Sequence, residues 1–401
     1  MKRRDFIKSV AAMAASYPFL RRFNPLLAQA STQQFFIPPT TLDVTENEAT
    51  IYFRLSKVTD LAEVIVRKNG TEIQRLPIDA MTQLRQLVTI KGLESASTYE
   101  AEVLVDGQTP GLLGFEEAWG PITFRTQPYE WPIRFAALGD SGFGDGVTQQ
   151  LADHIAQEEI NFFIHLGDMV YFSYEYDNDL WLNWMLKYYG PFKDTLRRVP
   201  HFMAVGNHDR EETTLLDGQS FIYWAFPPVH PDEAFEGRRQ WSSFVANDVQ
   251  FLALDSQVLY TDPGRAEQNQ WLDERLADPS FRTTIPFFHI PLWTSSSVHR
   301  DDGLPVSGDW YNRFSNAANR IGVVIAAHAH LYERLLLDNV HYITSGGGSQ
   351  SIYQLGEALA WSQKALSLAH YILVEVYKDK IVVVARDVNN SEIDTAEWSI
   401  L

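Results

Sequence analysis

Polar side chains follow directly on short apolar segments throughout residues 132–401, and this arrangement restricts the fold more than any other feature of the chain. Five such segments lie at residues 133–138, 162–164, 202–205, 285–288 and 323–326. Short apolar runs are typical of buried strands, and in an open α/β sheet the residues just past the strand ends form the site. We therefore expect neighbouring strands whose carboxyl ends bring distant residues together.

The residues that follow these segments carry oxygen and nitrogen donors that suit metal ions. The set comprises Asp140, Asp168, Tyr171, Asn207, His289, His328 and His330. Carboxylates, a phenol, an amide oxygen and imidazoles in this combination favour two ions of first-row character. Each residue alone has a more ordinary interpretation, such as a helix N-cap for Asp140 or a packing role for Tyr171. The ordered set nevertheless predicts a centre that holds two metal ions.

Helical and further strand segments complete an α/β pattern over residues 132–401. Val147, Leu151 and Ile155 are spaced four residues apart, which indicates one face of a helix over 147–158. Further segments predict a second helix and three closing strands, at residues 266–276, 341–345, 371–377 and 381–384. This alternation predicts one large α/β domain.

Residues 31–128 differ in character and predict a separate, smaller domain. Ala49, Ile51 and Phe53 alternate with other side chains, which is the period of a strand with one buried face. Several such strands predict an all-β sandwich, and the spacing from Gly92-Leu93 to Thr98-Tyr99 resembles a fibronectin-type-III-like domain. No cluster of titratable residues of catalytic type falls within it. We expect a structural or spacer role rather than a specific binding module.

The first 30 residues resemble a twin-arginine export signal. Arg3 and Arg4 precede a short apolar run at 10–15, and Ala28-Gln29-Ala30 offers a cleavage site of small residues. The run is much shorter than the roughly 20 residues that a membrane-spanning helix needs. We expect a signal peptide over residues 1–30, passage through the twin-arginine translocase, and a periplasmic or secreted product with no membrane span. The alternative is an amphipathic N-terminal helix.

Charge and cysteine content exclude several functions. The formal net charge of −18 argues against wrapping of nucleic acid and against binding to anionic membranes. An anionic substrate must then be attracted by local positive charge, which two metal ions would supply. The absence of cysteine excludes disulfides, cysteine-ligated zinc and a thiol nucleophile.

The polar blocks, in this order, resemble those of the metallophosphoesterase superfamily, and two details resemble purple acid phosphatases in particular. Tyr171 stands three residues after Asp168, where that family has its iron-binding tyrosine. The segment from His328 to Arg334 is similar to the family's last block, including its Tyr-Glu-Arg end. The resemblance spans roughly residues 33–400. It implies a four-layer αββα sandwich preceded by the small all-β sandwich domain.

The resemblance also implies how the metal ions are held. Fe(III) would be bound by Asp140, Tyr171 and His330. A divalent ion, which is Fe, Zn or Mn in the family, would be bound by Asn207, His289 and His328. Asp168 would bridge the two ions. Two such ions are a common device for attack on phosphate esters, so the resemblance implies an exported acid phosphatase that hydrolyses small phosphate monoesters.

Three further residues are candidates for catalytic roles, two in contact with the substrate and one indirectly. His208 would contact phosphate or protonate the leaving alkoxide, and Asp209 would orient the His208 ring. His299 stands near the position of the family's substrate-side histidines, which are often two adjacent residues, whereas this chain has Val298-His299. The missing second histidine keeps a phosphodiesterase or nucleotide-hydrolysing enzyme as an alternative.

Other interpretations remain open at this stage. A binding or adhesion protein with a vestigial catalytic fold would predict lost ligands, and all seven are present. The aromatic residues between 174 and 189 suit either the mouth of the site or a helix packed on the core. We expect Glu333 and Arg334 to form an ion pair that supports the histidine loop, and Gly346-Gly347-Gly348 to form a tight turn near the metals. The sequence gives no indication of the oligomeric state.

Overall fold

The computed structural model describes residues 34–81, 84–112, 117–171, 183–210, 241–257 and 264–400. The chain divides into two compact units. The first comprises Met1–Gln127 with Trp181–Pro200, and the second comprises Pro128–Leu180 with His201–Leu401. The expected signal peptide over residues 1–30 lies outside the described residues.

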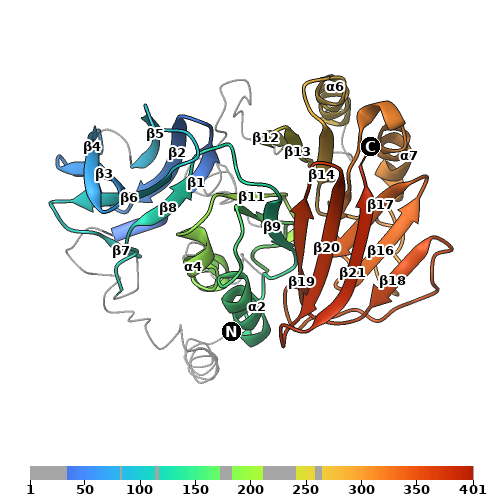
Figure 1. Ribbon diagram of the computed structural model, residues 1–401. Helices are drawn as coiled ribbons and strands as arrows, with labels where there is room; N and C mark the ends of the chain where they lie inside the picture. Colours follow the sequence, from blue (N-terminus) through green and yellow to red (C-terminus); the bar gives the residue numbers. More distant parts are fainter. Residues whose placement is uncertain are drawn as a thin grey trace, which may run out of the picture. The chain divides into compact units, whose positions relative to one another are not determined.

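The described strands of the first unit form two four-stranded sheets (Figure 1), with orders β5-β2-β1-β7 and β4-β3-β6-β8. The strands are β1 (Gln34–Val44), β2 (Glu48–Leu55), β3 (Ala62–Lys68), β4 (Thr71–Ile78), β5 (Arg85–Lys91), β6 (Thr98–Val105), β7 (Gly111–Leu112) and β8 (Ile122–Arg125). Tyr99, Ala101, Val103 and Val105 of β6 are buried and alternate with more exposed residues, as a strand with one core face requires. The expected N-terminal all-β region is confirmed.

Tyr99 also fixes a loop of this unit. Its hydroxyl accepts a hydrogen bond of 2.8 Å from the backbone N–H of Glu94, five residues upstream. A tyrosine near the start of a strand that bonds back to the preceding backbone is a hallmark of immunoglobulin-like sandwiches. The contact ties the start of β6 to the loop that precedes it.

A short helical segment outside residues 31–128 also belongs to the first unit. It contains the π-helix η4 (Met185–Tyr189) and the helix α4 (Lys193–Leu196). Trp184, Tyr188 and Tyr189 are fully buried. Among the described aromatic residues of the stretch 174–189, these three therefore pack in an interior, while residues 172–182 lie outside the described part.

The second unit contains two larger sheets. The six-stranded sheet has the order β11-β10-β9-β19-β20-β21, and the seven-stranded sheet has the order β12-β13-β14-β15-β17-β16-β18. The first comprises β9 (Ile133–Leu138), β10 (Phe162–His165), β11 (His201–Met203), β19 (His370–Val376), β20 (Lys380–Asp387) and β21 (Glu392–Ser399). The second comprises β12 (Ser242–Ala246), β13 (Val249–Ala253), β14 (Thr283–Phe287), β15 (Val324–Ala326), β16 (Tyr332–Leu337), β17 (Val340–Ser345) and β18 (Ser362–Leu366).

The two large sheets pack face to face through aromatic side chains. Phe135 of β9 lies 5.5 Å from Phe251 of β13, and Phe162 of β10 lies 5.2 Å from Phe244 of β12, both between ring centroids. All four rings belong to one buried cluster that draws on both sheets. Burying a side chain of this size contributes roughly 1.5–3 kcal/mol, so this interface forms the core of the unit.

Helices cover the outer faces of the two sheets (Figure 1). Helix α2 (Gly146–Ile155) contacts β19 of the six-stranded sheet. Helices α6 (Gly264–Leu276) and α7 (Leu304–Phe314) share a buried cluster with the other sheet, where Leu272 and Trp310 join Leu252 and Val324. The expected αββα order of layers is therefore confirmed.

The central strands place the predicted site residues at one edge of each sheet. β9, β10 and β11 are mutually parallel, as are β13, β14, β15 and β17. Parallel strands end at the same edge, so the turns that follow β9, β10, β11, β14 and β15 carry the candidate ligands. No helix among the described residues is long and apolar enough to cross a bilayer.

Candidate metal centre

Four of the predicted site residues have a left-handed backbone. The φ angle is +61° at Asp140, +55° at Asp168, and +62° at both His299 and His328. This conformation costs a non-glycine residue roughly 1–2 kcal/mol, and such strain is concentrated at functional sites. Gly206 shows how close the turns approach, because a Cβ there would lie 2.1 Å from the Asp168 carboxylate. The turns after the strands are thus shaped to direct side chains into one space.

One part of the centre consists of Asp140, Tyr171 and His330. The Tyr171 hydroxyl lies 3.1 Å from Asp140 Oδ1 and 3.0 Å from His330 Nε2. His330 Nε2 lies 3.4 Å from the same carboxylate oxygen. All three residues are at most 5 % exposed. A carboxylate, a phenol and an imidazole therefore meet in a buried place.

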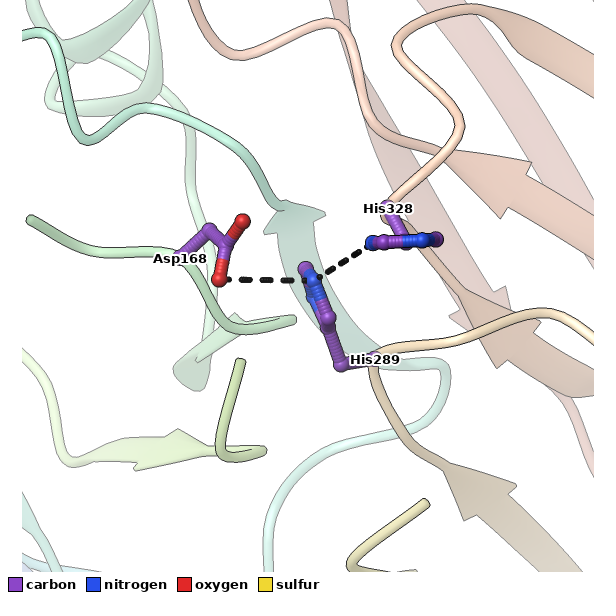
Figure 2. A group of neighbouring side chains, drawn as sticks. All are labelled: Asp168, His289 and His328. Atoms are coloured by element: carbon purple, nitrogen blue, oxygen red, sulfur yellow. Dashed lines mark hydrogen bonds and ion pairs between the residues drawn. The ribbon is translucent and has the colours of Figure 1, made fainter. Parts of the chain in front are cut away.

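The other part of the centre surrounds His289. Its Nε2 lies 3.1 Å from Asn207 Oδ1, 3.4 Å from Asp168 Oδ1 and 3.2 Å from His328 Nδ1. Figure 2 shows the His289 ring between Asp168 and His328. His289 Nε2 is also 4.0 Å from Asp140 Oδ1, so the two parts adjoin. The structure thus brings together the side chains of all seven predicted ligands.

Each imidazole of the centre is held from its outer side. His289 Nδ1 lies 2.8 Å from the carbonyl oxygen of Leu166, and His330 Nδ1 lies 2.7 Å from that of Ser351. His328 Nε2 lies 2.9 Å from the carboxylate of Asp302. Carbonyl and carboxylate oxygens only accept hydrogen bonds, so these outer nitrogens carry the proton, and in a neutral ring the inner nitrogen is a lone pair.

Lone pairs that face carboxylate and amide oxygens repel one another unless positive charge lies between them. Three inner imidazole nitrogens, two carboxylates, one amide oxygen and one phenol oxygen share this space. Outer acceptors that fix the tautomer of metal-binding histidines are the usual arrangement at metal sites. The residues therefore fit the pair of metal ions that the sequence predicts.

The pKa directions agree with a demand for positive charge. Burial alone would raise the pKa of Asp168, but His289 and His208 hold it below its ordinary value. Burial would lower the pKa of His289, yet the adjacent Asp168 and Asp140 raise it to about 10. Burial and the same carboxylates raise the pKa of the Tyr171 hydroxyl well above its ordinary value. The carboxylates thus stabilise a cation here, and a phenolate at Tyr171 needs a cation beside it.

Asp209 binds the backbone of the two turns that carry Asp168 and Asn207. Its carboxylate accepts hydrogen bonds from the N–H groups of Gly206 at 2.8 Å, Asp168 at 2.9 Å and Met169 at 2.8 Å. The residue is fully buried, and burial together with the charge of Asp168 raises its pKa to about 7. These bonds fix the two turns that carry Asp168 and Asn207, a role that the sequence interpretation of Asp209 did not include.

His208 and His299 lie at the border of the centre. His208 Nε2 is 4.0 Å from Asp168 Oδ2, and its ring is perpendicular to that of Tyr171 with 4.6 Å between centroids. The His208 side chain is 29 % exposed and that of His299 is 35 % exposed, so solvent reaches both. The His299 ring lies 4.5 Å from that of His328. Both histidine side chains are thus accessible from solvent at the border of the centre.

Two residues at the site escaped the sequence interpretation. Asp302 bonds both His328 and His299, and Tyr353 stacks on His330 with 4.1 Å between nearly parallel rings. Asp302 stands three residues after His299, which is a spacing that could have drawn attention to it. Tyr353 carries no such local signal, since only the folded chain brings it to His330.

The expected ion pair between Glu333 and Arg334 is wrong, because adjacent residues of strand β16 point to opposite faces. Glu333 accepts hydrogen bonds from Ser295 and Ser362, whereas Arg334 pairs with Asp394 at 2.9 Å. The glycine turn does lie beside the centre as expected, since a Cβ on Gly346 would come within 2.6 Å of Asp140 Oδ2.

Known proteins resemble this chain in sequence over about half of its length. Residues 133–332 match the family model described as calcineurin-like phosphoesterase. "Probable purple acid phosphatase 20" of Arabidopsis thaliana is 27% identical over 255 residues, which cover 58% of this chain and 55% of the relative. Purple acid phosphatase 22 of the same plant is 28% identical over 225 residues, covering 54% and 48%. The chain spans about half the length of the curated relatives it matches.

Solved structures resemble the chain over most of its length. The purple acid phosphatase PPD1 from yellow lupin (Lupinus luteus) seeds has a TM-score of 0.66 at 16% identity, covering 90% of this chain and 74% of that one. The structure of PhoD has a TM-score of 0.68 at 14% identity, covering 92% and 90%. At these identities the likeness shows the fold.

Proposed function

We propose, from the premise that residues 133–332 form a calcineurin-like phosphoesterase domain, that this chain is a dinuclear-metal phosphohydrolase. The reaction we assign to it is the hydrolysis of phosphate monoesters, as in an acid phosphatase. The observation that carries this proposal is the convergence of three inward imidazole nitrogens with Asp140, Asp168 and Tyr171. The purple acid phosphatases among its relatives support the same reaction class.

The donor chemistry supports an unequal pair of ions. Asp140, Tyr171 and His330 would hold Fe(III), because an anionic, oxygen-rich set suits a trivalent ion. The divalent ion, Fe, Zn or Mn, would be held by Asn207, His289 and His328, with Asp168 shared between both ions. When bound, the pair would activate water for attack on phosphorus and neutralise charge on the phosphate oxygens.

The chain's own residues would orient and protonate the substrate. His208 and His299 would contact the phosphate group, and His208 is our candidate for the proton donor to the leaving oxygen. Asp209 would act indirectly, by fixing the turns of Asp168 and Asn207 through its three backbone hydrogen bonds.

Metal analysis of the purified full chain, together with its visible spectrum and its turnover of nitrophenyl phosphate, tests the proposal. We expect two metal ions per chain, one of them iron, and a visible absorption band from the Tyr171 phenolate. Removal of the metals with a chelator should abolish turnover, and restoring iron and zinc should return it. A chain that hydrolyses the ester equally well without metal would refute the proposal.

A phosphodiesterase or nucleotide-hydrolysing enzyme is the second candidate function. It is favoured by Val298, which stands where relatives with two adjacent histidines would have a second donor and which is 42% exposed. The two candidates differ in substrate preference. Turnover of nitrophenyl phosphate should exceed that of bis-nitrophenyl phosphate if the chain is a monoesterase, and a strong preference for the diester would favour the second candidate.

We also propose that the chain is exported by the twin-arginine route and acts in the periplasm or outside the cell. Lys2-Arg3-Arg4 and the small residues at 28–30 support this assignment. Replacement of both arginines by lysine should retain the protein inside the cell. Export of that variant at the normal level would contradict the route.

We further propose that residues 31–128 form a fibronectin-type-III-like sandwich that serves as a spacer domain. The hydrogen bond between the Tyr99 hydroxyl and the Glu94 backbone supports this assignment.

A further inference from the structure

A single carboxylate oxygen joins the metal centre to its substrate side. Asp302 Oδ2 lies 2.9 Å from His328 Nε2 and 2.8 Å from His299 Nδ1. We propose that Asp302 is a positioning residue that couples the metal ligand His328 to the substrate-side His299. This inference rests on the proposed function, in which His328 binds a metal ion and His299 contacts the substrate.

The tautomers of both rings follow from this contact. A carboxylate accepts hydrogen bonds, so His328 donates from Nε2 and His299 donates from Nδ1. His328 therefore presents Nδ1 inward, where it lies 3.2 Å from His289 Nε2. His299 is left with Nε2 for a ligand on the opposite side of its ring. One acceptor thus decides which nitrogen each ring offers.

The backbone holds Asp302 and His299 in a fixed relation. The Asp302 N–H lies 3.3 Å from the carbonyl oxygen of His299, which closes a turn. His299 has a φ of +62°, the left-handed conformation that Asp140, Asp168 and His328 also adopt. Gly303 follows, and a Cβ there would lie 2.0 Å from the carbonyl oxygen of Pro291. The turn is therefore packed against the segment that follows His289, which places Asp302 within reach of His328.

The orientation of His299 is especially important because Val298 precedes it, so the chain has one imidazole here in place of two adjacent ones. His299 cannot share its task with a neighbouring histidine, so its orientation depends on Asp302. Loss of the Asp302 carboxylate should then have two distinct effects, one on each histidine. Metal should bind more weakly through His328, and substrate should bind more weakly through His299.

The test compares Asp302→Asn with Asp301→Asn, because Asp301 is the adjacent carboxylate and its side chain is exposed. Zn²⁺ affinity is measured on the full chain by competition with a chelator, which needs no turnover. We expect Asp302→Asn to weaken Zn²⁺ binding about 10–100-fold, the usual effect of losing an outer partner of a metal-binding histidine. Asp301→Asn should bind Zn²⁺ as the unaltered chain does, and Asp302→Glu should recover part of the affinity.

His299→Ala separates the two arms of the coupling. This variant should retain the Zn²⁺ affinity, yet raise the KM for nitrophenyl phosphate at saturating metal. Adding Asp302→Asn to it should raise KM no further, since the ring that Asp302 orients is already gone. Asp302→Asn with unchanged Zn²⁺ affinity and unchanged KM would overturn the inference.

The outcomes also distinguish this inference from the proposed function. If the unaltered chain hydrolysed no phosphate ester but Zn²⁺ binding still depended on Asp302, the proposed reaction would fall and the link from Asp302 to His328 would stand. If the chain were an active phosphatase whose Zn²⁺ affinity and KM ignored Asp302, the reaction would stand and the coupling would fall.

Discussion

At the scale of single residues, the side chains that meet inside the centre could be recognised from the sequence, whereas most acceptors that hold the imidazoles from outside could not. The inner donors follow buried strands and form local motifs, so sequence could indicate all seven. The outer partners include carbonyl oxygens of Leu166 and Ser351, and any residue supplies a carbonyl. Asp302 is 26 positions from His328, a distance that only the fold closes.

Asp168 is the residue whose loss should be most damaging. Its carboxylate lies 3.4 Å from His289 Nε2 and accepts the backbone N–H of His208 at 2.9 Å. Asp168→Asn removes the negative charge that two cations would share, so we expect turnover of nitrophenyl phosphate to fall more than about 100-fold, beyond the 10–100-fold typical of outer partners. Asp153→Asn, on an exposed position of helix α2, is the control. Normal turnover and metal content in Asp168→Asn would contradict the assignment of the centre.

His208 can act on the substrate in two ways, and the leaving group distinguishes them. A proton donor matters most when the leaving oxygen is strongly basic. If His208 protonates it, His208→Ala should lower kcat for an alkyl phosphate by about 100-fold or more, and should affect nitrophenyl phosphate much less. Equal losses with both substrates would assign His208 to phosphate binding alone. The measurement is kcat for the two esters in both proteins at saturating metal.

At the scale of elements, the central strand β9 was predictable and the edge strand β21 was not, although the edge strand β11 does overlap the segment predicted at 202–205. The strand predicted at 133–138 is β9 with the same bounds, because this largely buried central strand is apolar at every position except Arg134. Strand β21 escaped the sequence interpretation, since its pattern from Glu392 to Ser399 contains three acidic residues and it lies at a sheet edge. Charge at an edge protects against unwanted pairing but removes the apolar signal.

One contact between elements should make stability depend on pH. Asp394 of β21 accepts hydrogen bonds from Arg334 and Tyr332 of β16, both at 2.9 Å, and so joins the two large sheets. Burial alone would raise the pKa of Asp394, but Arg334 and Tyr332 hold it below its ordinary value. A carboxyl with a lowered pKa stabilises the fold above its unfolded pKa, and this contribution is lost as the pH falls through the folded value.

Asp394→Asn should therefore lower the free energy of unfolding by about 1–3 kcal/mol at pH 6, because the Arg334 charge loses its partner. The difference from the unaltered chain should shrink as the pH falls below about 4, where the unaltered carboxyl also becomes neutral. Denaturant unfolding at several pH values measures this. Glu397→Gln, which affects an exposed pair with Lys380, is the matched control. A difference that stays constant down to pH 2 would show that the charge of Asp394 is not its cause.

At the scale of the whole molecule, membership of the two units could not be predicted from sequence. Residues 181–200 lie between strands β10 and β11 of the second unit, yet they belong to the first. Aromatic residues such as Trp184 and Tyr188 suggest from sequence that the segment is buried, as the structure shows, but they do not indicate which unit it packs in. Tertiary packing decides that, and a single sequence carries no signal for it.

The centre also has a consequence for the stability of the second unit, because its ligands come from both large sheets. Asp140, Asp168 and Asn207 follow strands of the six-stranded sheet, whereas His289 and His328 follow strands of the seven-stranded sheet. A pair of metal ions bound there would link the two sheets, and it could bind only to the folded state, where these ligands lie together. Ligands that bind only the folded state stabilise it, by about 4 kcal/mol at a concentration 1,000 times the dissociation constant.

Scanning calorimetry of the full chain with and without a chelator measures this stabilisation. We expect the chelated protein to unfold at a temperature several degrees lower, and saturating Zn²⁺ to reverse the shift. The same titration on Asp168→Asn serves as control, because that variant lacks the shared ligand and should gain less from Zn²⁺. If chelation left the unfolding temperature unchanged while removing the metal, the ions would not link the sheets, even if they supported hydrolysis.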